Sequence, residues 1–102
     1  MDREVVHIVL FRWKPGTSAA QRDAAHAALR GLATAIPGIV DLTCGPNFTD
    51  RAKGFETGLV VRFVNRKALE AYLPHPAHRR VVDEVINPIR EDSLALDYEV
   101  EA

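Results

Sequence analysis

Residues 5–13 read VVHIVLFRW, a run of β-branched and aromatic residues that predicts a β-strand. Successive side chains of a strand point to opposite faces. One face therefore carries Val5, His7, Val9 and Phe11, and the other carries Val6, Ile8, Leu10 and Arg12. Because both faces are mostly apolar, we expect this strand to lie in the middle of a sheet that is covered on both sides.

The remaining pattern predicts two helical regions and three more strands. Thr17 or Ser18 is a suitable N-cap, and Pro37-Gly38 ends the helix that follows. In chain order we expect a helix to about residue 35, strands over about 39–44 and 55–64, short helices over about 65–73 and 77–85, and a strand over 93–100. The order strand, helix, strand, strand, helix, strand is that of an α+β, ferredoxin-like (βαββαβ) fold.

Length and charge restrict the function classes. The chain has 102 residues, the size of one domain, so residues 1–102 are expected to share one core. Thirteen basic residues stand against 14 acidic ones, with no basic stripe, which argues against nucleic acid as a partner. The apolar run after the N-terminus is too short and too polar for a signal peptide or a membrane span. We therefore expect a cytoplasmic protein that does not engage membranes.

The second face of the predicted sheet needs a cover. If the helices lie on one face, the other still exposes Val6, Ile8, Leu10 and Val60. An apolar surface of this kind indicates a partner. We expect a homodimer in which the two sheets meet face to face.

The segment Tyr72–His78 is the part of the chain where we expect a small ligand to bind. A helix starting near residue 77 would place His78 in its first turn, where the helix dipole favours a neutral imidazole, the form that a general base requires. Tyr72 is near enough to donate a hydrogen bond to a carbonyl or enolate oxygen. His75, between two prolines, is expected in a turn, and a metal site formed by His75 and His78 is disfavoured because Pro76 disrupts the helical spacing.

Two residues from distant strands could join this segment. Asp97 lies in an apolar strand, where a carboxylate is costly unless it is paired. It could orient His78 through Nδ1–H, as in catalytic triads, and His7 is the other candidate partner. A structural tie between helix and sheet explains an Asp97–His78 pair equally well. His26, at the edge of the buried stripe of the first helix, is expected to be half exposed.

The residues His7-Ile-Val-Leu-Phe-Arg-Trp-Lys14, Ile36-Pro-Gly-Ile39, Tyr72-x-x-His75-Pro-x-His78 and Asp97-Tyr98 resemble the stress-responsive α/β-barrel (Dabb) family over nearly the whole chain. The resemblance implies a dimeric α+β barrel. It assigns catalysis to Tyr72 and His78, with His7 and Asp97 in support, and it implies no redox cofactor. The wall of the pocket is expected to include Val9, Phe11, Leu29, Thr57, Leu59 and His75. In some members backbone carbonyls hold Mg²⁺, and the corresponding residues are Ala33, Ile36 and Ile39.

Three functions remain open from the sequence. The first is a cofactor-free enzyme of the polyketide cyclase type, or a ligand-binding relative of one, that acts on a carbonyl-rich or phenolic compound. The second is a non-catalytic, stress-associated binding or structural dimer. The third is a barrel monooxygenase, which shares the fold class.

Overall fold

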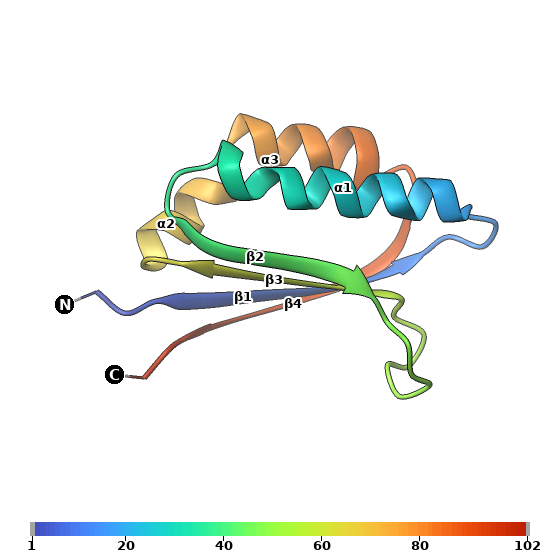
Figure 1. Cartoon of the computed structure of the whole chain (residues 1–102), viewed down its shortest axis with the longest axis horizontal. Helices are drawn as coiled ribbons and strands as arrows, with labels where there is room; N and C mark the ends of the chain where they lie inside the picture. Colours follow the sequence, from blue (N-terminus) through green and yellow to red (C-terminus); the bar gives the residue numbers. More distant parts are fainter. Residues whose placement is uncertain (1, 102) are drawn as a thin grey trace.

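The computed structural model of the chain describes residues 2–101 as one four-stranded antiparallel sheet with helices on one face (Figure 1). The elements are β1 (Val5–Trp13), α1 (Ala19–Ala35), β2 (Ile39–Pro46), β3 (Thr57–Phe63), α2 (Arg66–Tyr72), α3 (Pro76–Val81), the π-helix η1 (Val82–Ile86) and β4 (Arg90–Glu99). The strand order is β2-β3-β1-β4. This order confirms the ferredoxin-like fold and the central place of β1.

The ends of the elements follow local chemistry. Ser18 caps α1 and forms a capping box with Gln21, so that each satisfies a free backbone N–H of the first turn. At the other end, Pro37 cannot donate to the helix, and Gly38 takes a φ of +89° that glycine adopts without strain. The helix predicted over 77–85 starts at Pro76, and its second half is the π-helix η1. The strand predicted over 93–100 starts earlier, at Arg90, and ends at Glu99.

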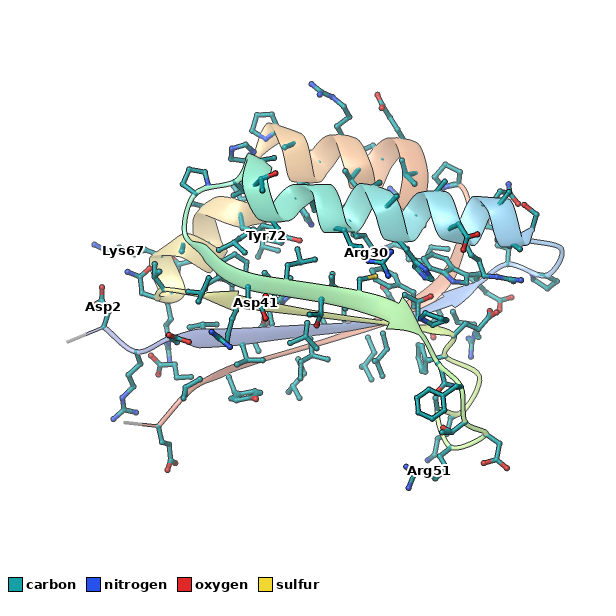
Figure 2. All side chains as sticks on the ribbon, viewed as in Figure 1. Asp2, Arg30, Asp41, Arg51, Lys67 and Tyr72 are labelled. Atoms are coloured by element: carbon teal, nitrogen blue, oxygen red, sulfur yellow. The ribbon has the colours of Figure 1, made fainter. Side chains whose placement is uncertain are left out.

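The core lies between the helices and one sheet face. Its buried residues come from every layer: Val5, Phe11, Trp13, Ala25, Leu29, Leu32, Ile36, Leu59, Val61, Phe63, Tyr72, Ile86 and Ile89. Figure 2 shows side chains filling the space between α1 and the sheet. Within the described residues, no helix combines the length and the apolar character needed to span a membrane.

The opposite sheet face has no covering layer among residues 2–101 (Figure 1). In the register of β1 with β4, Ile8 pairs with Leu96 and Leu10 pairs with Leu94, so all four side chains share this face. Leu94 is 56% exposed and Leu96 is 59% exposed. Figure 1 shows the helices on the other side of the sheet. The expected uncovered apolar face is therefore present, with Val60 40% exposed, although Val6, which was expected to be exposed on it, is buried at 7%.

Candidate functional site

Tyr72 ends α2 and points into the core (Figure 2), where its side chain is fully buried. Its ring packs on Phe63, with centroids 5.0 Å apart, and on His78, with centroids 4.3 Å apart. The hydroxyl is sealed from solvent and makes no hydrogen bond. Burial raises the pKa of Tyr72 to about 12, so the hydroxyl stays protonated near neutral pH and is able to donate. A buried hydroxyl without a partner is costly, so it calls for an explanation, of which a catalytic role is one.

The break between α2 and α3 fixes the orientation of His78. His75 is the N-cap of α3, and its Nδ1 accepts a hydrogen bond from the N–H of Ala77 at 3.1 Å, so it is a half-buried cap rather than a turn residue with a solvated ring. The Nδ1–H of His78 donates to the carbonyl oxygen of Leu73 at 2.9 Å. A carbonyl only accepts, so the proton of a neutral His78 ring is on Nδ1 and its Nε2 carries a free lone pair.

The surroundings of His78 keep this ring neutral. Burial lowers its pKa, the carbonyl of Leu73 opposes that shift, and the nearby charges of His7, Arg79 and His75 lower it further. The sequence predicted the direction of the shift but attributed it to the helix dipole, whereas burial is the main cause. Among the residues that the structure describes, Nε2 has no hydrogen-bond partner, and it is not sealed from solvent. His78 therefore presents, beside the Tyr72 ring, an unprotonated ring nitrogen that is able to accept a proton.

Asp97 pairs with His7 rather than with His78. The two are direct neighbours across β1 and β4, and the Nδ1 of His7 lies 2.5 Å from Oδ1 of Asp97. Because the carboxylate accepts, the proton of a neutral His7 ring is on Nδ1, and its Nε2 is then the free nitrogen. The His7 ring lies 5.9 Å from the Tyr72 ring, centroid to centroid. The predicted tie between His78 and Asp97 is wrong, and the alternative His7–Asp97 pair is what forms.

The cluster thus joins Tyr72, His78, His7 and Asp97 from four elements. One pocket of about 330 Å³ reaches Asp97, but its lining includes neither Tyr72 nor His78. Of the residues expected to line the site, Val9 and Leu59 face each other across β1 and β3, and Val9 is two residues from His7 on the same face of β1. Phe11 and Thr57 pair four residues from His7, about 14 Å away along β1, and Leu29 belongs to the core.

His26 was expected to be half exposed, and this expectation is wrong. It is 5% exposed, and its Nε2 hydrogen-bonds Oγ1 of Thr57 at 2.8 Å. Burial lowers its pKa, and the charge of Arg30 adds to this effect. The helical spacing placed His26 at the edge of the buried stripe, and only the polar partner on β3 explains why it enters the interior.

The expected carbonyl site for Mg²⁺ lies at the end of α1. The carbonyl of Ala33 lacks its usual helical donor, because Pro37 has no N–H, so it is free to accept a ligand. With the carbonyls of Ala33, Ile36 and Ile39, such an ion would fasten the turn into β2 and would take no part in proton transfer. Over residues 2–101, no group of three His, Cys, Asp or Glu side chains is placed to hold a metal.

Comparisons with known proteins agree with this architecture. A stress-response A/B barrel domain-containing protein of Arabidopsis thaliana is 30% identical over 95 residues, which are 92% of this chain and 36% of that protein. The chain thus spans about a third of that relative.

Solved structures share the fold over almost their whole length. A dimeric ferredoxin-like protein of unknown function from Thermobifida fusca is 26% identical, with a TM-score of 0.86 over 98% of this chain and 93% of that one. The hydroxynitrile lyase of Passiflora edulis is 24% identical, with a TM-score of 0.88 over 99% and 96% of the two chains. The family model of the stress responsive A/B barrel domain (Dabb) matches residues 5–100, and the chain belongs to this family.

Proposed function

We propose that this protein is a cofactor-free enzyme that transfers protons on a small carbonyl-rich or phenolic compound, with Tyr72 and His78 as its catalytic residues. The observation that carries the proposal is the contact between two complementary groups. The ring of Tyr72, whose hydroxyl has no hydrogen-bond partner, packs against the ring of His78, whose Nε2 is an unprotonated acceptor. These are the two groups that enolate chemistry requires.

The mechanism follows from the protonation states. Nε2 of His78 removes a proton from the carbon next to a carbonyl, and Tyr72 donates a hydrogen bond to the enolate oxygen that forms. In an aldol ring closure of the kind performed by the plant polyketide cyclase olivetolic acid cyclase, the carbanion then attacks a second carbonyl of the same substrate molecule. The new alkoxide takes back the proton held by His78, so the reaction needs no redox partner.

His7 and Asp97 support the site from the sheet. The carboxylate of Asp97 holds the Nδ1–H of His7, which leaves Nε2 of a neutral His7 as an acceptor that is not sealed from solvent. A substrate oxygen or water can donate to it. We assign His7 the role of holding the substrate against Tyr72. That the same fold carries a lyase in Passiflora edulis supports an active site on this scaffold.

We also propose that the working form is a homodimer joined through the uncovered sheet face. Leu94, Leu96 and Tyr98 are each about half exposed there, beside Ile8 and Leu10 of β1. Burial of one such leucine contributes roughly 1.5–3 kcal/mol. The description of the Thermobifida fusca structure as dimeric supports this arrangement.

A non-catalytic, stress-associated dimer is the second candidate, and the sealed state of the Tyr72 hydroxyl favours it. Catalysis requires this hydroxyl to be exposed to a substrate. In the second candidate Tyr72 and His78 only pack α2 and α3 on the core.

One pair of variants separates the two. With a linear poly-β-keto thioester as substrate, the wild-type protein is expected to give a cyclised product, and His78→Ala is expected to lower the rate about 10²–10⁴-fold. Arg80→Ala, an exposed change on the same helix, is the matched control and should keep the wild-type rate. If the wild type gives no product and His78→Ala only lowers the melting temperature, the second candidate is correct.

A further inference from the structure

A larger pocket lies at the other end of the sheet from Tyr72. It has a volume of about 460 Å³, within the range of small-molecule sites. One wall is the face of α1 made by Ala19, Arg22, Asp23 and His26, and the other is the chain between β2 and β3. The pocket is separated from His7 by the position of Leu59, whose side chain is buried in the core. It is therefore not a branch of the Tyr72–His78 cluster.

A chain of hydrogen bonds forms the inner end of this pocket. The Nε1–H of Trp13 donates to Oγ1 of Thr57 at 3.1 Å, and Oγ1 of Thr57 lies 2.8 Å from Nε2 of His26. Thr57 has one hydroxyl proton, and if it donates that proton to Nε2, the indole N–H, the hydroxyl and Nε2 each have a partner. His26 then carries its own proton on Nδ1.

Nδ1 of His26 is the unpartnered atom of the site. His26 is 5% exposed, yet Nδ1 makes no hydrogen bond within the described chain and is not sealed like the Tyr72 hydroxyl. A buried polar nitrogen that opens only into a pocket requires a partner from outside the protein. Water or a ligand must supply it.

The charges around this nitrogen restrict what the ligand is. Arg22 forms an ion pair with Glu56 at 3.7 Å and donates a hydrogen bond to the carbonyl of Thr17 at 3.1 Å. Asp23 and Asp50, which also line the pocket, form no ion pair in residues 2–101. The free carboxylates disfavour an anion, and the Nδ1–H of His26 disfavours an ammonium group. A ligand hydroxyl suits both His26 and Asp23, because it accepts a hydrogen bond from the Nδ1–H of His26 and donates one to the carboxylate of Asp23. Phe55, half buried in the wall, offers an apolar surface for the carbon skeleton.

We propose that this pocket, the His26 pocket, binds a small uncharged polyhydroxylated ligand of about monosaccharide size, with His26 and Asp23 as its hydrogen-bonding residues. The site is independent of the reaction proposed for Tyr72 and His78, so failure of one leaves the other standing. It would give the domain a second ligand at the opposite end of its sheet.

Trp13 is the chain's one tryptophan, and its indole N–H belongs to the hydrogen-bond chain, so it reports on the pocket directly. In an NMR titration of the full chain with D-glucose or D-ribose, the indole signal and the amides of residues 47–56 should shift and saturate. Asp23→Ala, an exposed change that should not impair folding, is expected to weaken binding about tenfold, as is His26→Phe. Asp83→Ala, on η1, is the control and should bind as the wild type does.

Propylammonium and acetate are the comparison probes, and neither should shift the indole signal saturably. Saturation with either ion but with no sugar would overturn the proposal, as would the absence of a saturable shift with both sugars. Equal sugar binding by Asp23→Ala and the wild type would also overturn it. Because none of these readouts uses the aldol reaction, they do not depend on the activity proposed above.

Discussion

The ring of Tyr72 lies against the ring of His78, with centroids 4.3 Å apart, although Pro74 and Pro76 interrupt the helix between them. The break creates this contact. It ends α2 just after Tyr72 and starts α3 at Pro76, so His78 returns over the phenol ring and donates to Leu73. Both residues therefore depend on the same short connection for their positions.

Replacement of Tyr72 by Phe should change stability and activity in opposite directions. The hydroxyl is buried without a partner, so its removal should raise the free energy of unfolding by about 1 kcal/mol in urea denaturation. The same change should lower turnover of the poly-β-keto thioester about 10²–10³-fold, because the enolate loses its donor. A loss of stability together with full activity would show that the hydroxyl has a structural role.

The protein should lose stability as the pH falls below about 6.5. Burial lowers the pKa of both His26 and His78 from the usual 6.5, so below that value the unfolded chain binds more protons than the folded one. Their contribution to stability is present above 6.5 and is lost as pH falls through the lower folded-state pKa values. Urea midpoints measured from pH 7.5 to pH 5 should decline, and His26→Gln should make the decline shallower.

Much of this architecture could be predicted from the sequence, because strand alternation is a local property. The alternation of β1 and β4 placed His7 and Asp97 on helix-facing positions, and their pairing needed only the register. The partner of His78 could not be found this way, because the acceptor is the backbone carbonyl of Leu73, which no side-chain pattern reveals. The His26 pocket depends on the path of the chain between β2 and β3, which composition does not determine.

Two glycines should respond in opposite ways to alanine. At Gly38, φ is +89° and an added Cβ would come within 2.7 Å of Cβ of Ala68, so Gly38→Ala should destabilise the protein by more than about 1 kcal/mol. Gly31 lies inside α1 with nothing within 4 Å of an added Cβ, so Gly31→Ala should stabilise by about 0.5–1 kcal/mol. Thermal unfolding of the two variants checks both signs, and a stabilised Gly38→Ala would contradict the tight turn between α1 and β2.

A charge on the uncovered sheet face should separate the proposed dimer. Leu96 is 59% exposed and pairs with Ile8 in the middle of that face, so Leu96→Glu would place a carboxylate inside the interface. Light scattering after gel filtration should give the mass of two chains for the wild type and of one chain for Leu96→Glu. Leu73→Glu is the matched control, since Leu73 is 48% exposed at the end of α2, away from the sheet face, and this variant should remain a dimer. A wild-type protein that elutes as one chain at all concentrations would contradict the sheet-to-sheet dimer, whereas dissociation of both variants would place the interface elsewhere.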